Sequence, residues 1–199
     1  MIKRSNLAAL ALSAAALVGI TAHEGYRETA HIPVKGDVPT LGFGSTAGVK
    51  LGDTITPEKA LSRALTDIQA FEGALKKCVK VPLHQHEYDA AVSFSYNVGA
   101  AAFCGSTLVK KWNAGDYEGG CNELPRWVKA GGRVLPGLVK RREAERVLCL
   151  GLSINEGENE LSRARYGYKK IDGFGGAAGG LPGLPYGVGG LQCAAWVGG

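Results

Sequence analysis

Two stretches decide the fold of this chain: Glu24-Gly-Tyr-Arg27 and, a little further on, Gly36-Asp-Val-Pro-Thr-Leu-Gly-Phe-Gly44. Residues 31–34 and 38–44 form two short apolar runs that suit β-strands. Polar Lys35-Gly-Asp37 separates the runs, and a glycine-containing polar break of this kind is typical of a β-hairpin. We therefore predict an antiparallel hairpin shortly after Glu24.

Helices are predicted on the C-terminal side of this hairpin. Thr56 is a suitable N-cap and Pro57 suits the first turn, and apolar residues then recur on one stripe as far as Leu75. A second helix begins near Leu83 and ends at Asn97-Val-Gly99, where glycine can terminate it. Shorter helices are predicted over residues 105–113, 116–127 and 138–150.

The length and composition fit one globular domain. The chain has 199 residues, of which 45% are apolar and 21% charged, and single domains commonly have about 100 to 200 residues. These values exclude wholesale disorder and a polytopic membrane protein. The 30 glycines gather towards the C-terminus without a three-residue period, which excludes collagen. Residues 151–199 are predicted to be a glycine-rich, flexible tail.

The chain is basic, with a net charge of +5 and a pI near 9.0. A basic protein favours an anionic partner, such as nucleic acid, acidic lipid or a cell-wall polymer, and charge alone does not choose among them. No metal or cofactor is predicted. His84 and His86 lack the spacing of a helical pair of zinc ligands.

The five cysteines permit two disulfide bonds in an oxidising compartment, with Cys193 left over in the tail. No C-x-x-C pair is present, which argues against a zinc ribbon. We expect Cys104 to pair with Cys121, because these residues lie in successive short helices that can pack antiparallel, and Cys78 to pair with Cys149. Four cysteines allow three connectivities, and reduced thiols in the core are the alternative.

The N-terminus has the layout of an export signal. Lys3 and Arg4 precede residues 7–22, which contain no charge and are mostly Ala, Leu, Val, Ile and Gly. This segment is marginal as a membrane span, because about 20 apolar residues cross a bilayer comfortably and alanine and glycine contribute little transfer free energy. We therefore predict that residues 1–22 can enter a membrane and leave it again. A conventional, cleaved signal peptide is the alternative.

Glu24 and Asp37 are candidates for acid–base chemistry. A carboxyl at the end of an apolar helix, facing a hairpin that holds a second carboxylate, is the arrangement that glycosidic cleavage needs. One acid protonates the leaving oxygen, and the other, ionised, activates water. The chain has 18 acidic residues, so a chance pair of solvated surface charges is the alternative.

Further motifs connect this pair to a known family. The order of motifs from about residue 23 to residue 150 resembles the phage-type lysozymes, the glycoside hydrolase family 24 endolysins. The resemblance rests on the two stretches quoted above and on the following ones: Asp89-Ala-Ala-Val-Ser-Phe-Ser-Tyr-Asn-Val-Gly99, Phe103-Cys-Gly-Ser-Thr-Leu108, Asn113-Ala-Gly-Asp-Tyr117, Arg126-Trp127, Gly131-Gly-Arg-Val-Leu-Pro-Gly-Leu138 and Arg141-Arg-Glu-Ala-Glu-Arg146.

The resemblance implies an α+β fold that is predominantly α, with a two-lobed, lysozyme-like catalytic domain over residues 23–150 and a small β-hairpin lobe. It implies cleavage of a β-1,4 bond in peptidoglycan, with inversion through an activated water. Glu24 matches the family's general acid, and Thr40 matches the threonine that helps to hold the water or the product.

In the family, the position of the second carboxylate follows from its spacing to the general acid and to the threonine. In this chain the two spacings fall on Pro33 and Val34, which are not acidic. We assign the role of base to Asp37, the nearest acid, in a hairpin about two residues longer than usual. If that turn displaces Asp37, His31 is the candidate that binds substrate instead. Arg133 and Arg142 are predicted to attract the carboxylate-rich wall polymer, and a solvated helix face is the alternative for these cations.

The resemblance also gives the apolar N-terminus a second interpretation. Some family members look like signal-arrest-release enzymes, which stay inactive while an uncleaved, weakly apolar anchor holds them in the membrane. Residues 5–22 are predicted to contact the host inner membrane transiently and then to pack as the first helix, with the enzyme entering the periplasm. The segment contains no cysteine, so a thiol switch is disfavoured. Peptidoglycan is the predicted partner of a monomeric enzyme, without nucleic acid.

Two other functions remain open. A lytic transglycosylase uses one acid and yields an anhydro-sugar instead of a reducing end. Because Asp37 departs from the family's spacing for the base, this alternative stays open. A membrane-active or wall-binding protein without catalysis would use the apolar segment as its working part. Such a protein predicts that function survives the loss of Glu24.

Overall fold

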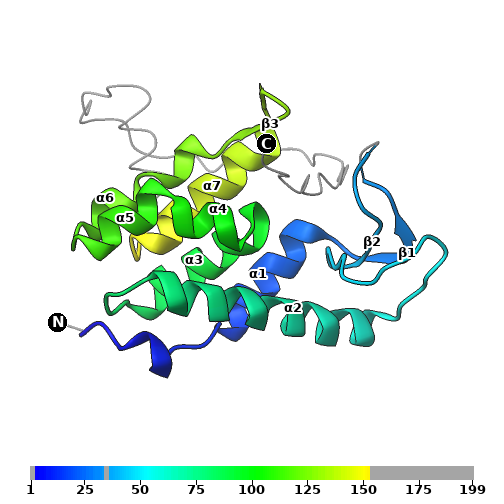
Figure 1. Cartoon of the computed structure of the whole chain (residues 1–199), viewed down its shortest axis with the longest axis horizontal. Coiled ribbons are helices and arrows are strands. Elements are labelled where there is room, and N and C mark those ends of the chain that lie inside the picture. Colours follow the sequence, from blue (N-terminus) through cyan, green and yellow to red (C-terminus); the bar gives the residue numbers. More distant parts are fainter. Residues whose placement is uncertain (1–2, 34–35, 153–199) are drawn as a thin grey trace, which may run out of the picture.

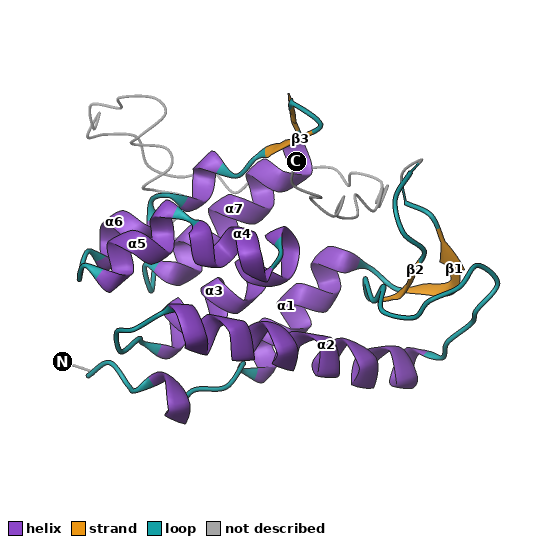
Figure 2. Cartoon of the chain, in the orientation of Figure 1, coloured by secondary structure: helices purple, strands orange, loops and turns teal. Residues whose placement is uncertain are grey.

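The computed structural model of the chain describes residues 3–33 and 36–152. Within them, a helical lobe carries a small β-lobe at one side, and the helix α1 (Ala14–Glu24) points from the first lobe towards the second (Figure 1). Helices dominate and the strands are short (Figure 2). The predicted α+β, predominantly α, two-lobed fold is therefore confirmed. Most of the predicted tail, from residue 153 on, lies outside the described residues.

The β-lobe is the predicted hairpin. Strand β1 (Arg27–His31) pairs antiparallel with β2 (Thr40–Gly42), with His31 opposite Thr40 and Arg27 opposite Gly42. The first strand starts earlier than the apolar pattern suggested. Ala30, Leu41 and Val49 are the buried apolar residues of this lobe, so its core is small and its position depends on contacts with the helical lobe.

The helix α2 (Pro57–Cys78) begins where the sequence predicts. The Thr56 side chain accepts a hydrogen bond from the backbone N–H of Lys59, and Pro57 occupies the first turn, where its missing N–H costs nothing. Its buried stripe includes Ile68 and Leu75, and the helix runs alongside both lobes (Figure 1).

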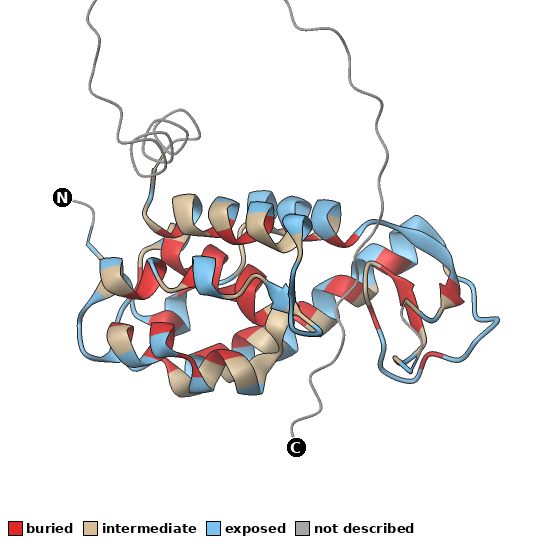
Figure 3. Cartoon of the chain, turned by 90° about the horizontal axis from the view of Figure 1, so that it is seen from above, coloured by how far each residue is buried: buried red, intermediate tan, exposed pale blue. Residues whose placement is uncertain are grey.

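The helix α3 (Gln85–Val98) is the central element of the helical lobe, because all its residues from Glu87 to Ser95 are buried. It packs against α1, α2 and α7 (Pro136–Cys149). Buried residues line the inner faces of these helices, and the outer faces are exposed (Figure 3). The remaining elements are η1 (Leu7–Ala9), α4 (Ala100–Gly105), α5 (Thr107–Asn113), α6 (Tyr117–Cys121), η2 (Leu124–Arg126), β3 (Lys129–Ala130) and β4 (Arg133–Val134).

The apolar N-terminal run divides into two helical pieces. It forms η1 and most of α1, whose first turn is capped by the Ser13 hydroxyl. Leu7, Leu10 and Ile20 are buried in the same core as the rest of the helical lobe. Among the described residues, none of the helices combines the length and the apolar character that crossing a membrane requires.

The structure contradicts the expected disulfide pairing. Cys78 is bonded to Cys104 and Cys121 to Cys149, with Cα–Cα separations of 5.6 and 5.7 Å, both within the range of ordinary disulfides. The expectation failed because α2 packs against α4, which carries Cys104, while Cys149 at the end of α7 is bonded to Cys121 of α6. Cys193 lies outside the described residues.

Removing one of these bonds is expected to lower stability measurably. The Cys78–Cys104 bond closes a loop with a sequence separation of 26, and loop-closure entropy for such a length gives about 3.5 kcal/mol in the chain-entropy model. The double variant Cys78→Ser/Cys104→Ser should therefore lose about that much unfolding free energy in urea. Non-reducing peptide mapping checks the connectivity itself, and a peptide joining Cys104 to Cys121 would contradict the structure.

Candidate active site

The last residue of α1 is Glu24, and its side chain is only 3% exposed. Gly25 ends the helix with φ 69°, and its N–H bonds to the Thr21 carbonyl oxygen. This left-handed backbone geometry favours glycine. The chain can therefore turn immediately into β1, and the Glu24 carboxylate is held between the two lobes.

Arg141 of α7 is the main partner of Glu24. Its Nη1 donates to Glu24 Oε1 at 2.7 Å, its Nε donates to Glu145 Oε1 at 3.2 Å, and its Nη2 contacts a backbone carbonyl of α3 at 3.3 Å. Both members of the Glu24–Arg141 ion pair are buried. A buried carboxylate needs such a partner, because desolvating an unpaired charge is costly.

A second arginine completes the buried network. Arg142 Nε lies 2.9 Å from Glu145 Oε2, its Nη2 donates to Asn97 Oδ1 at 2.9 Å, and its guanidinium lies over the Phe94 ring. Ser93 also donates to Glu145 Oε1, at 2.8 Å. The two arginines are thus balanced by Glu24 and Glu145, and the network joins α1, α3 and α7.

The turn after β2 forms the other side of the site. Gly44 has φ 93°, and a Cβ added there would lie 3.3 Å from Glu24 Oε2. Glycine is therefore needed at this position both for the backbone conformation and for the space beside the carboxylate. The Tyr96 hydroxyl of α3 donates to the Phe43 carbonyl oxygen at 3.0 Å, which holds this turn against the helical lobe.

The hairpin brings Thr40 and His31 opposite one another. Thr40 is buried, and its hydroxyl donates to the Val38 carbonyl oxygen at 3.2 Å. Asp37 lies in the preceding loop, where its Oδ1 accepts the Val38 N–H at 2.9 Å. Its Oδ2 is buried and accepts no hydrogen bond from the part of the chain that the structure describes.

The two predicted substrate-binding arginines have different environments. Arg133 is exposed on β4, in a second hairpin that the sequence pattern did not predict. Arg142 is 0% exposed, so its guanidinium lies in the core in this structure, and the contact with substrate that the sequence predicts remains a prediction. The physical reason for its burial is helical phase, because Arg142 lies on the face of α7 that packs against α3.

Three residues beside Glu24 were not assigned to the site from the sequence: Arg141, Tyr96 and Gly44. The i, i+4 spacing of Arg141 and Glu145 on a predicted helix was an available signal. For Tyr96 and Gly44 the residue type gave no signal, because their roles depend on how the two lobes meet.

Histidine and carboxylate clusters offer no metal site within residues 3–33 and 36–152, where no three potential ligands lie together. His84 and His86 stack with their ring centroids 5.2 Å apart, and His86 Nδ1 lies 3.0 Å from the Cys149 carbonyl oxygen. His84 precedes α3 as its N-cap. Both histidines thus lie at the start of α3, where their contacts are with the protein itself.

His23 is expected to make the fold sensitive to acid. Partial burial lowers the pKa of His23 below its ordinary value of 6.5, and the neighbouring charge of Arg141 lowers it further, while Glu24 opposes these effects. The unfolded chain then binds the proton more readily than the folded one, so stability falls as the pH drops through about 6.5. Thermal unfolding at pH 7.5 and 5.5 should show a smaller acid loss in His23→Gln than in the parent. An equal loss in both would contradict this origin.

Comparisons with known proteins identify the family of the chain. The phage lysozyme family model matches residues 21–145. The endolysin of Acyrthosiphon pisum secondary endosymbiont phage 1 is 43% identical over 141 residues, which cover 69% of this chain and 96% of the relative. The SAR-endolysin of Pseudomonas phage phiKMV is also 43% identical over 141 residues, with 69% and 87% covered.

Solved structures give the same result. The muramidase domain of SpmX from Asticaccaulis excentricus has a TM-score of 0.66 and 30% identity, covering 71% of this chain and 98% of that domain. The endolysin of the Escherichia coli phage FAHEc1 has a TM-score of 0.65 and 35% identity, covering 71% and 94%. The fold and these similarities define a glycoside hydrolase of the muramidase class. The chain belongs to the phage lysozyme family, whose members act on peptidoglycan.

Proposed function

We propose that this endolysin hydrolyses the β-1,4 bond between N-acetylmuramic acid and N-acetylglucosamine, and that lysis of the bacterial host follows. The observation that carries this proposal is the buried Glu24 carboxylate, which Arg141 holds at 2.7 Å where the two lobes meet. The net charge of +5 suits a wall polymer rich in carboxylates, and exposed Arg133 is a candidate for that attraction.

Glu24 acts as the general acid. Its Oε1 accepts the hydrogen bond from Arg141, while Oε2 faces the turn at Gly44. A proton on Oε2 can therefore pass to the glycosidic oxygen while Arg141 still holds the other oxygen. General acid catalysis of this kind contributes about 10² to 10⁴-fold to the rate.

Asp37 acts as the general base, and Thr40 helps to hold the attacking water. The buried Oδ2 of Asp37 accepts no hydrogen bond from the described residues, which leaves that oxygen for a water molecule. Inversion follows if a water fits between the two carboxyls, a geometry that requires a separation of about 6.5–9.5 Å. His31, opposite Thr40 across the hairpin, is the candidate for a contact with the sugar.

Residues 5–22 hold the newly exported enzyme in the host inner membrane, where it is inactive. The similarity to a relative named SAR-endolysin supports this regulation. The apolar run also supplies most of α1, and α1 ends on Glu24, so a chain held in the bilayer would keep the acid away from Arg141 and Gly44. After release, the monomer acts in the periplasm, with residues 23–150 as the catalytic domain.

The products of digestion test the reaction. Purified full-length protein should convert isolated peptidoglycan to fragments with reducing ends, which mass spectrometry separates from 1,6-anhydro products. Asp37→Asn should lose most of the activity. Anhydro products would favour the transglycosylase, which needs one acid, and an active Asp37→Asn would show that another group is the base.

The proposal that residues 5–22 tether the enzyme to the inner membrane has a separate test in fractionated cells. We expect the intact chain, with its N-terminus retained, first in the inner-membrane fraction and later in the periplasm. Peptidoglycan isolated from the same cells should be cleaved by the periplasmic form only. A chain shortened near residue 22 would instead identify the segment as a cleaved signal peptide.

A further inference from the structure

The turn after β2 is closed by its own backbone. The Leu41 N–H donates to the Ser45 carbonyl oxygen at 2.9 Å, and the Ser45 N–H donates to the Leu41 carbonyl oxygen at 3.0 Å. Gly44 lies within this turn, and a Cβ added to Gly44 would be 3.3 Å from Glu24 Oε2. The position of residues 41–45, the acid-facing turn, therefore decides how much space is left beside the Glu24 carboxyl.

Two side chains of α2 hold the end of the acid-facing turn and the residues that follow it. The Ser45 hydroxyl is buried and donates to Asp67 Oδ2 at 2.5 Å. One helical turn earlier, Arg63 Nη2 donates to the Ala47 carbonyl oxygen. Hydrogen bonds to charged groups are about twice as strong as neutral ones. The far end of α2 belongs to the core of the helical lobe, where Leu75 is buried, so these bonds attach the turn of the small lobe to the helical lobe.

Gly44 is flanked on both sides by residues that the helical lobe holds. The residue before it is Phe43, whose carbonyl oxygen accepts the Tyr96 hydroxyl of α3 at 3.0 Å. The residue after it is Ser45, whose hydroxyl donates to Asp67. The contacts of Tyr96 and Asp67 therefore fix the backbone of Gly44 from both sides along the chain.

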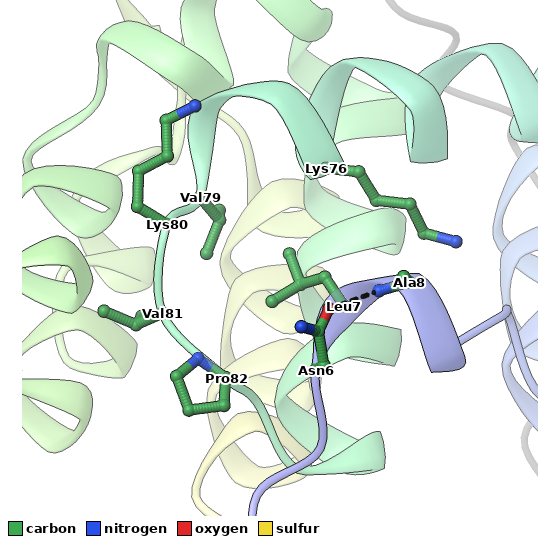
Figure 4. A pocket seen from close by; sticks show the side chains of 8 residues that line it. All are labelled: Asn6, Leu7, Ala8, Lys76, Val79, Lys80, Val81 and Pro82. Carbon is green, nitrogen blue, oxygen red and sulfur yellow. Dashed lines mark hydrogen bonds between the residues drawn. The ribbon is translucent and has the colours of Figure 1, made fainter.

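The pocket of the helical lobe is a separate feature of α2. Its volume is about 510 Å³, and it lies between residues 6–8 and the C-terminal end of α2 with residues 79–82 (Figure 4). Lys76 of α2 lines this pocket, and Asp67 lies about 13 Å before Lys76 along the helix axis, at about 1.5 Å per residue. Ser45 and Asp67 therefore act on the acid-facing turn and not through this pocket.

We propose that Ser45 and Asp67 are positioning residues for the hydrolysis: their hydrogen bond keeps Gly44 against the Glu24 carboxyl and so sets the space that the glycosidic oxygen enters. The inference rests on the proposed role of Glu24 as the general acid. Displacing a reacting group by about 1 Å can cost about 10²-fold in rate. Losing this hydrogen bond therefore lowers kcat, while sugar contacts made elsewhere on the hairpin are kept, so KM changes little.

Ser45→Ala and Asp67→Ala test the inference in the full-length enzyme. At a temperature well below the melting temperature of each variant, kcat on soluble peptidoglycan fragments should fall about tenfold to a hundredfold in both, and KM should change less than about twofold. The double variant should be no slower than the slower single variant, because both substitutions remove one interaction. Asp67→Asn should keep more activity than Asp67→Ala, since the amide oxygen still accepts the Ser45 hydroxyl.

Gln69→Ala is the matched control, because Gln69 is exposed on the same helix. This substitution should leave kcat unchanged within about twofold, as is usual at the surface. A purely structural role of Asp67 would lower the melting temperature of Asp67→Ala and leave kcat of the folded enzyme at the parent's value. That result would overturn the proposal.

Hydrogen exchange gives a readout that does not depend on catalysis. Asp67→Ala should raise the exchange rates of the Leu41 and Ser45 amides about tenfold or more, the factor expected for losing a charged hydrogen bond. Unchanged exchange would show that the bond does not hold the turn, contrary to the proposal. An inactive parent enzyme would refute the proposed function, whereas an active parent with unchanged kcat in Ser45→Ala and Asp67→Ala would overturn this inference alone.

Discussion

Glu24→Gln is expected to lower peptidoglycan hydrolysis about a thousandfold, with the fold retained. The amide of glutamine can still accept the hydrogen bond from Arg141, but it cannot donate a proton to the glycosidic oxygen. The side chains have nearly the same volume, so the packing beneath the turn at Gly44 is kept. Initial rates on isolated peptidoglycan measure the loss, and near-ultraviolet circular dichroism checks the fold.

Glu118→Gln is the matched control for this substitution. Glu118 is exposed on α6, so the same loss of one carboxylate should leave the rate unchanged within about twofold, as is usual for surface substitutions. Undiminished hydrolysis by Glu24→Gln would show that Glu24 is not the general acid. Cell lysis that survives Glu24→Gln while hydrolysis of peptidoglycan is lost would favour the wall-binding or membrane-active function that needs no acid.

The fold was largely predictable from local patterns. The N-cap at Thr56 with Pro57, the stripe of α2 and the glycine after α3 gave the two long helices, because each signal acts within a few residues. The hairpin around Asp37 was found for the same reason. By contrast, β3 and β4 contain two residues each, which is too short for a periodic signal.

Contacts between distant residues were less predictable. The disulfide connectivity failed because four cysteines on separate helices allow three pairings, and only the packing of α2 against α4 chooses among them. The different roles of the adjacent residues Arg141 and Arg142 were also not predictable from the sequence. Arg141 faces Glu24 and Arg142 faces Asn97, and a shift of one residue on a helix turns a side chain by about 100°. Sequence spacing alone does not fix that phase.

Arg142→Ala is expected to destabilise the helical lobe strongly. The guanidinium is fully buried, and its loss leaves Glu145 with fewer partners in the core and removes a contact with the Phe94 ring. Removing one member of a buried ion pair costs about 3–5 kcal/mol, and Glu145 keeps Arg141 and Ser93 as partners, so we expect about 3 kcal/mol. Urea unfolding measures this loss, and the melting temperature should fall by roughly 10 °C.

The same substitution separates a structural role from substrate binding. If Arg142 acts only within the network, KM for peptidoglycan fragments at low temperature should change less than about twofold, as for a change remote from substrate. Arg133→Ala is the matched control, because its exposed side chain on β4 should cost almost no stability. Arg133 is also the remaining candidate for wall attraction, so its variant should bind the polymer more weakly. A raised KM without a lower melting temperature in Arg142→Ala would restore the substrate role that its burial argues against.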